Sequence, residues 1–344
     1  MRVEKLATVD AFVVFDLEEA ETAWGVVRSA PKILVDGAIW LARTRTYQLA
    51  SFELRIGGAS AGINAQAADV DAAVERFVEE VRPWVAAHRF LPDPGRGVSL
   101  ADLELLRSDD PRGAGYFEHR DALTALGLAE AGSTALGGLD GRRAAVECFD
   151  AVGPLLIDEL VERGAKVVAV GTAKGTVVSS EGLDPAQVAG CWAQYGPELV
   201  EHLGRPISPA ADLPGVEVDG LFLGSKAGLL DHHVAGGVRA GVVVPTGPVP
   251  VTAKALAILR RRGIEVLPDF VTTAGSLFGA PSVVGVDATS SEVEVIRDLV
   301  TRRISEVLAE VRVHEDGALL AACYRAESFL RTWCHQLPFG RPLA

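Results

Sequence analysis

The feature that most constrains the fold is the run "AAVECFDAVGPLLIDELVERGAKVVAVG" at residues 144–171. An apolar strand, a tight turn, an amphipathic helix and a second apolar strand follow one another in this order, which is typical of a βαβ unit in a parallel sheet. Where such a unit binds a dinucleotide, the turn reads G-x-G-x-x-G. Here the three glycine positions hold Cys148, Asp150 and Gly153. The run therefore predicts the architecture of a nucleotide turn without its usual chemistry.

The rest of the chain extends this pattern into an α/β fold with two domains, because 344 residues exceed the usual span of one hydrophobic core. From about residue 121, strand-like and helical runs alternate as in a doubly wound, Rossmann-like domain, and the last of these strand-like runs is at 265–271. Before it, strand-like runs at 10–17, 22–30 and 47–56 surround a clear amphipathic helix at 69–85. Long amphipathic helices at 290–313 and 318–334 are expected to pack back on the first domain. The expected boundaries are 1–120, 121–285 and 286–344.

Composition and charge exclude several classes of protein. The formal net charge of −13 and the pI of about 5.1 argue against nucleic acid and anionic membranes as partners, because the field would repel a polyanion. The N-terminal residues contain no uninterrupted apolar segment followed by a small-residue cleavage site, so we expect a cytoplasmic protein. The cysteines form no CxxC pair, and the adjacent His232 and His233 have no evident third ligand, so no metal site is expected.

Three blocks of the chain resemble the glutamate/leucine/phenylalanine/valine dehydrogenase family, and most closely its short leucine- and phenylalanine-type branch. They are "TYQLASFELRIGGASAGI" at 46–63, the βαβ block at 141–184, and "VPVTAKALAILRRRGIEVLPDFVTTAG" at 249–275. The resemblance implies an N-terminal α/β substrate-type domain, a Rossmann-like cofactor domain, a cleft between them and a homo-oligomer, a dimer or larger.

The family's reaction needs a lysine of lowered pKa, a proton-transferring carboxylate and a cation for the substrate carboxylate. The catalytic lysine ends a Gly-Gly-x-Lys turn, where this chain has Ser60, and the substrate-binding lysine follows Thr-Tyr in the preceding strand, where it has Gln48. The resemblance matches Asp93 to the proton-transferring aspartate. It also matches Lys32 to an arginine that follows Gly-Gly-x, and Thr124 to a threonine near the nicotinamide. Asp93 is thus the best surviving catalytic candidate, with Lys32, Gln48 and Ser60 lining the former substrate pocket; Asp93 as a turn residue and Ser60 as a neutral turn residue stay open.

The turn that would bind the dinucleotide also departs from the family's motif. In a working turn the second glycine lets backbone approach the diphosphate, whereas Asp150 places a carboxylate there. Two like charges about 4 Å apart repel by about 1 kcal/mol in water and about 4 kcal/mol at an effective dielectric near 20. Asp150 is also suited to cap the following helix, and Cys148 to lie in the core. The acid expected to hold the ribose is Thr172, with Lys174 as a candidate partner for a 2′-phosphate.

The sequence thus predicts an amino-acid-dehydrogenase fold with degenerate motifs that has lost NAD-dependent oxidative deamination. The leading hypothesis is a repurposed protein, or pseudoenzyme, that performs non-redox chemistry on a small metabolite or binds it, with no cofactor expected. One alternative is a divergent NAD(P)-dependent amino-acid oxidoreductase. A second is a non-catalytic structural partner of an active relative.

Overall fold

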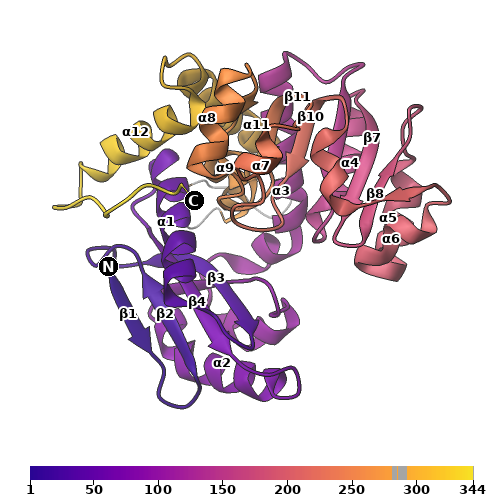
Figure 1. The fold of residues 1–344 in the computed structure, drawn as a ribbon. Coiled ribbons are helices and arrows are strands. Elements are labelled where there is room, and N and C mark those ends of the chain that lie inside the picture. The colour runs from indigo at the N-terminus through magenta and orange to yellow at the C-terminus, as the bar shows by residue number, and fades with distance from the viewer. Residues whose placement is uncertain (281–284, 286–292, 344) are drawn as a thin grey trace. The chain divides into compact units, whose positions relative to one another are not determined.

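The computed structural model describes residues 1–280, 285 and 293–343. Within these residues the chain forms two compact units, one from Met1–Glu118 with Cys323–Pro342, the other from His119–Gly279 with residues 293–322. Each unit contains its own β-sheet and helices (Figure 1). The expected mixed α/β fold with two sheets is therefore confirmed.

The sheet of the first unit has the order β1-β2-β4-β3-β5. Strands β3, β4 and β5 are parallel, while β1 and β2 run antiparallel to their neighbours. Helix α1 covers one face, where its Ala38 and Ala42 pack on Phe12 and Val14 of β2. Helix α2 covers the other face with the apolar side predicted from the sequence. The elements are β1 (Arg2–Lys5), β2 (Ala11–Phe15), β3 (Ala23–Ala30), α1 (Val35–Ser51), β4 (Gly57–Asn64), α2 (Val70–Ala86) and β5 (Phe90–Pro94).

The strand expected at 47–56 is wrong, because α1 continues to Ser51 and a loop follows it. The buried side of this helix mixes small and polar residues with only two large apolar or aromatic ones, Tyr47 and Leu49, so its sequence lacks a strong helical stripe. These small residues let α1 lie directly on β4: a Cβ atom on Gly58 would come within 1.9 Å of the Ala42 carbonyl oxygen. Thr46 Oγ1 accepts a hydrogen bond from the Gly58 N–H at 3.0 Å. Gln48 therefore lies on a helix, not on a strand.

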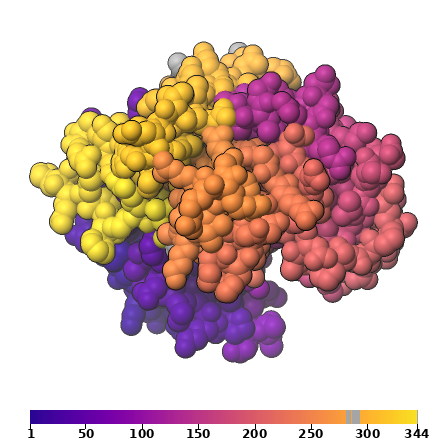
Figure 2. Space-filling model, turned by 45° about the horizontal axis from the view of Figure 1, so that its top comes forward, coloured from indigo at the N-terminus to yellow at the C-terminus, as the bar shows by residue number. Residues whose placement is uncertain are grey.

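The sheet of the second unit has the order β12-β11-β10-β6-β7-β8-β9. The five strands from the edge strand β12 to β7 are parallel, and the order reverses at β6, as in a doubly wound fold. With right-handed connections, this reversal places α4 and α8 on opposite faces. Figure 2 shows α8, in orange, at the surface. The elements are α3 (Gly113–Leu136), β6 (Arg143–Glu147), α4 (Val152–Glu162), β7 (Lys166–Thr172), β8 (Gly175–Val178), α5 (Pro185–Tyr195), α6 (Leu199–His202), β9 (Ile207–Ser208), β10 (Val218–Leu223), α7 (His232–Ala235), β11 (Ala240–Pro245), α8 (Ala253–Arg261) and β12 (Glu265–Val266).

The C-terminal part of the chain is helical. The strand expected at 265–271 covers only Glu265–Val266, because Pro268 ends it and the short helix α9 (Asp269–Thr272) begins. The long helices predicted there are present as α11 (Val293–Arg312) and α12 (Ala318–Leu330); residues 290–292 of the first prediction lie outside the described residues. α11 packs on α9. No helix in the described part of the chain is both long and apolar enough to cross a bilayer.

Candidate functional site

Asp93, the carboxylate singled out from the sequence, is the centre of a buried hydrogen-bond network in the first unit. It lies on β5 and is only 2% exposed. Its Oδ1 accepts hydrogen bonds from Arg112 Nη1 at 2.6 Å and from the Tyr116 hydroxyl at 2.7 Å. Its Oδ2 accepts from Trp24 Nε1 at 2.7 Å and from Arg45 Nη2 at 3.1 Å. Tryptophan and arginine can only donate, so Asp93 is held as an acceptor on both oxygens.

Arg112 joins two carboxylates in this network, and its side chain is 0% exposed. Its Nε and Nη2 bind Asp110 at 2.9 and 2.6 Å, and its guanidinium lies over the Trp24 and Tyr116 rings, 4.9 and 4.6 Å from their centroids. Burial acts to lower the pKa of Arg112, but Asp93 and Asp110 outweigh it, and the pKa stays above its ordinary value. Arginine is thus the charged partner of Asp93 here, although the sequence analysis did not identify it.

Gln48 lies one helical turn after Arg45 on α1, and Arg45 links it to Asp93. Arg45 Nη1 donates to Gln48 Oε1 at 2.5 Å, while the neighbouring Nη2 binds Asp93. The Arg45 side chain is 16% exposed. The cation that the resemblance places at position 48 is therefore present three residues earlier on the same helix face. Recognition of α1 as a helix would have revealed this spacing.

Ser60 lies on β4, on the sheet face covered by α1, and is 0% exposed. In the register of the sheet, Ser60 and Asp93 are both opposite Val26, one on each side of β3. The Ser60 hydroxyl has no hydrogen-bond partner in the described part of the chain. The structure thus brings Asp93, Gln48 and Ser60 to one face of the first sheet.

The other two substrate-side candidates have different surroundings. Lys32 is an exposed residue of the loop between β3 and α1. Thr124 belongs to the second unit, on α3, and its hydroxyl donates to the Arg120 carbonyl oxygen at 2.8 Å. The hydroxyl of Thr124 is therefore used within its own helix.

The nucleotide turn of the second unit has two structural functions. Cys148 is fully buried, and burial raises the pKa of its thiol well above the usual range. A Cβ atom on Gly153 would lie 2.8 Å from Cys148 Sγ, so the third glycine lets α4 pack on the end of β6. Asp150 Oδ1 accepts a hydrogen bond from the Val152 N–H at 3.0 Å, which satisfies one donor at the start of α4. The capping expected for Asp150 is thus present, from the residue before the N-cap.

The carboxyl group of Asp150 is only partly stabilised as an anion. Although the residue keeps solvent-accessible surface, the protein atoms packed around the carboxyl group desolvate it and raise its pKa to about 6. The Asp121 carboxylate acts in the same direction, against the Val152 N–H. A second anion placed beside this group would meet the same desolvation and the same negative charge.

Glu147, which the sequence analysis did not identify, occupies the point where the strand order reverses. It ends β6, and its Oε2 accepts hydrogen bonds from the Gly224 and Ser225 N–H groups at 2.9 and 3.0 Å, just beyond β10. Its Oε1 accepts from the Ser225 hydroxyl at 2.6 Å. Ligands of doubly wound folds bind beyond the strand ends at such a reversal. Here a carboxylate of the chain itself takes these backbone donors. Its only sequence signal is an acid at the end of an apolar strand.

Thr172, at the position expected for a ribose-binding acid, also makes hydrogen bonds within the chain. The Thr172 hydroxyl donates to the Pro197 carbonyl oxygen at 2.7 Å and accepts from the Lys174 N–H at 3.1 Å. Lys174 Nζ is 3.0 Å from Glu198, which raises the pKa of this exposed lysine by a hydrogen bond and by its charge. The ammonium group of Lys174 is therefore already paired with a carboxylate of the chain.

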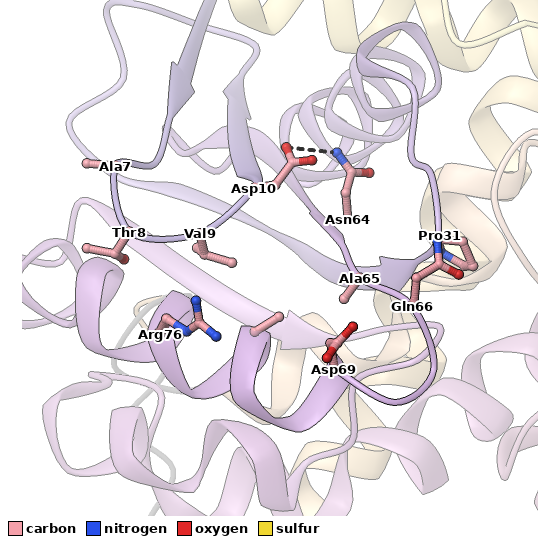
Figure 3. A pocket seen from close by; sticks show the side chains of 11 residues that line it. Ala7, Thr8, Val9, Asp10, Pro31, Asn64, Ala65, Gln66, Asp69 and Arg76 are labelled. Atoms are coloured by element: carbon pink, nitrogen blue, oxygen red, sulfur yellow. Dashed lines mark hydrogen bonds between the residues drawn. The ribbon is translucent and has the colours of Figure 1, made fainter.

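A hollow of about 650 Å³ on the first unit is separate from these residues. It is bordered by the β1–β2 turn, the end of β4 and the start of α2 (Figure 3). Asn64 Nδ2 donates to Asp10 Oδ1 at 3.2 Å across its wall. None of the residues predicted from the sequence lines it. Within the described residues, no group of three or more His, Cys, Asp or Glu side chains is arranged to hold a metal ion.

The fold and these site positions define a chain of the amino-acid dehydrogenase class. Residues 115–319 match the family model for glutamate/leucine/phenylalanine/valine dehydrogenase, and the chain belongs to this family. Its sequence is 24% identical to the NADP-specific glutamate dehydrogenase of Saccharolobus shibatae over 280 residues, which cover 74% of this chain and 66% of that protein. It is 26% identical to the glutamate dehydrogenase of Thermotoga maritima over 283 residues, with coverage of 74% and 67%. The chain thus spans about two thirds of the length of these relatives.

Solved structures share the fold. The hetero-hexameric glutamate dehydrogenase of Thermus thermophilus in its leucine-bound form superposes with a TM-score of 0.77 at 23% identity, covering 94% of this chain and 84% of that one. The L-tryptophan dehydrogenase of Nostoc punctiforme gives a TM-score of 0.65 at 19% identity, covering 96% and 95%.

Proposed function

We propose that this chain is a non-oxidising member of its family that binds a small metabolite and does not carry out NAD(P)-dependent oxidative deamination. The observation that carries the proposal is the hydrogen bonding of both carboxylate oxygens of Asp93. Its two oxygens accept four hydrogen bonds from buried or nearly buried donors. A carboxylate that must accept and release protons to a substrate nitrogen needs an accessible oxygen and a free acceptor position.

The other substrate-side positions support binding rather than chemistry. Gln48 and Ser60 stand where the resemblance places lysines, and neither can act as an ammonium group. Ser60 is fully buried, and the four donors to Asp93 described above are tryptophan, tyrosine and arginine side chains rather than histidine. A serine nucleophile needs a neighbouring base and access to the substrate. For these reasons we favour ligand binding over a non-redox reaction.

The second unit does not fit a dinucleotide. A diphosphate at the strand reversal would need free N–H groups and no neighbouring anion. The Gly224 and Ser225 N–H groups are bound to Glu147, and the Val152 N–H is bound to Asp150. Thr172 offers no carboxylate to a ribose. The proposed function therefore includes no catalytic step through NAD(P).

Cofactor binding and turnover test this proposal together. We expect the purified chain to show no saturable change in nicotinamide fluorescence with NADH or NADPH below roughly millimolar concentration. No reduction of NAD or NADP should occur with a panel of L-amino acids. The Thermotoga maritima relative, assayed in parallel, controls for the conditions. Saturation at micromolar cofactor, or amino-acid-dependent reduction, would refute the proposal and support a divergent oxidoreductase.

The names of the relatives, including an NADP-specific enzyme, favour the alternative of a divergent NAD(P)-dependent oxidoreductase.

A structural partner of an active relative is the second alternative. It is favoured by the Thermus thermophilus structure, which is described as hetero-hexameric. We propose that the present chain assembles with copies of itself, and light scattering of the purified protein should give a mass of at least a dimer. A monomer that gains mass only on addition of a lysine-bearing paralogue from the same host would instead identify a partner subunit.

Branch and location complete the proposal. We place the chain with the short leucine- and phenylalanine-type branch, since it covers 95% of the tryptophan dehydrogenase chain but 84% of the Thermus chain. A cytoplasmic location, expected from the sequence, is also part of this proposal.

A further inference from the structure

Arg28 lies on the same sheet face as Asp93 and Ser60, and the proposed function has not yet assigned it a role. It belongs to β3, where Val26 and Arg28 point to the side covered by α1, because Val26 pairs with Ser60 and Arg28 pairs with Gly62. Val26 is also opposite Asp93 on β5. Arg28 is therefore one side chain further along the strand than the Ser60–Asp93 level, towards the carboxyl end of the three parallel strands.

The guanidinium of Arg28 has buried donors without acceptors. Its Nε and Nη2 atoms are both inaccessible to solvent and have no hydrogen-bond partner in the described part of the chain. These two nitrogens form one edge of the guanidinium, and that edge binds a carboxylate through two parallel N–H···O bonds. The unused donors thus have the geometry of a bidentate site.

The charge of Arg28 is uncompensated as well. Burial lowers the pKa of its guanidinium, and the neighbouring Arg96, in the loop after β5, lowers it further by repulsion. No carboxylate in the described part of the chain acts on this pKa in the opposite direction. A water molecule could accept from the two N–H groups but would leave the positive charge unpaired. Proteins pair buried charges with few exceptions, so an anion is the missing partner.

We propose that Arg28 is the anion-binding residue of this face and takes the carboxylate of a small metabolite along its Nε–Nη2 edge, with Arg96 supplying a second positive charge. The inference rests on the binding function proposed above and names the ligand class. A carboxylate fits better than a phosphate because one planar edge and one like-charged neighbour match a planar group with a single negative charge. The net charge of −13 makes unspecific anion binding by the rest of the surface unfavourable.

Titration calorimetry with the full-length protein tests this proposal. The probes are pyruvate, succinate and L-leucine, with inorganic phosphate and sulfate for comparison. We expect saturable binding of at least one carboxylate probe. Arg28→Gln should weaken it about tenfold to a hundredfold, the range for hydrogen bonds to a charged group. Arg28→Lys should give an intermediate loss because it keeps the charge without the fork. Arg55→Gln, a change at an exposed arginine of the same unit, should leave binding unchanged.

The stability of the free protein gives an independent readout. Because Arg28 Nε and Nη2 have no acceptor among the described residues, Arg28→Met should leave the melting temperature in anion-poor buffer unchanged or raise it by a few degrees. A marked fall would mean that Arg28 has a structural partner, and it would overturn the proposal. So would binding of phosphate or sulfate alone, or the absence of saturable binding by every carboxylate probe. Absence of binding together with absence of NAD(P) turnover would refute only this inference, whereas NAD(P)-dependent amino-acid oxidation would refute the function proposed above.

Discussion

At the scale of single residues, Asp93 and Arg112 form a pair in which both partners are buried. Removal of one member leaves the other charge without compensation, which typically costs about 3–5 kcal/mol. We expect Arg112→Met to lower the free energy of unfolding by that amount, because Asp93 and Asp110 both lose a donor. Denaturant titration would measure it. Arg82→Gln, which breaks the exposed pair with Asp109, should cost less than about 1 kcal/mol. Equal effects of the two changes would contradict the role assigned to Arg112.

Asp269, in contrast to the Asp93–Arg112 pair, lowers the stability of the folded protein when it ionises. It is 3% exposed, and burial raises its pKa from 3.8 to about 6, although its Oδ2 accepts the Val249 N–H at 2.7 Å. A carboxyl group whose pKa is raised on folding binds its proton more tightly in the folded state, so the protein loses stability as the pH rises from about 4 to about 6.

The variant Asp269→Asn should lack this loss, because asparagine keeps the acceptor for the Val249 N–H without the charge. We expect it to gain about 3 kcal/mol relative to the wild type between about pH 4 and about pH 6.5. Unfolding curves across this range compare the two proteins. A difference that stays constant with pH would show that Asp269 ionises normally.

At the scale of elements, the contact between β6 and α4 depends on the absence of a side chain at position 153. A Cβ atom there would lie 2.8 Å from Cys148 Sγ and 2.9 Å from its Cα, and the Cα belongs to backbone that cannot rotate away. Gly153→Ala should therefore destabilise the protein by about 1–3 kcal/mol.

Gly190→Ala in α5 is the matched control, because a Cβ atom at position 190 meets nothing within 4 Å. Alanine is the better helix former, so this change should stabilise the protein by up to about 1 kcal/mol. Chemical denaturation of both variants measures whether the free energy of unfolding falls or rises. A neutral Gly153→Ala would mean that α4 can move away from β6.

The elements that could be predicted from the sequence are those whose own residues carry the signal. The stripe of α2 and the alternation from β6 to α8 indicate their structures directly. Helix α1 could not be recognised in this way, because its buried side mixes small and polar residues, and the close approach of the small ones depends on Gly58 of a later strand. The end of β12 follows from a proline that the pattern at 265–271 did not weigh.

At the scale of the whole molecule, some residues of the candidate site could be predicted from the sequence and others could not. Asp93, Gln48 and Ser60 could be located because they stand at positions of a family motif. Their partners Arg45 and Arg112 could not, since nothing in the sequence places 45 or 112 beside 93 before the fold is known. Charges that are far apart in sequence and meet only in the folded chain are outside the reach of local pattern.

Activity of the family type needs both units, so repair of one should not restore it. The double change Gln48→Lys and Ser60→Lys returns the two lysines that the resemblance implies, but leaves Glu147 and Asp150 on the N–H groups at the strand reversal. Ser60→Lys also places an ammonium group at a fully buried position, on the sheet face that already carries Arg28.

We expect this double variant to melt at a lower temperature than the wild type and to show no NAD(P)-dependent oxidation of amino acids. The single change Gln48→Lys shows how much of this fall comes from position 48, where a lysine removes the acceptor of Arg45 Nη1 and adds a like charge beside it. Coupled absorbance assays of reduced nicotinamide measure the activity. Recovery of oxidation in the double variant would mean that the second unit binds the cofactor despite its carboxylates, and it would refute that part of the proposed function.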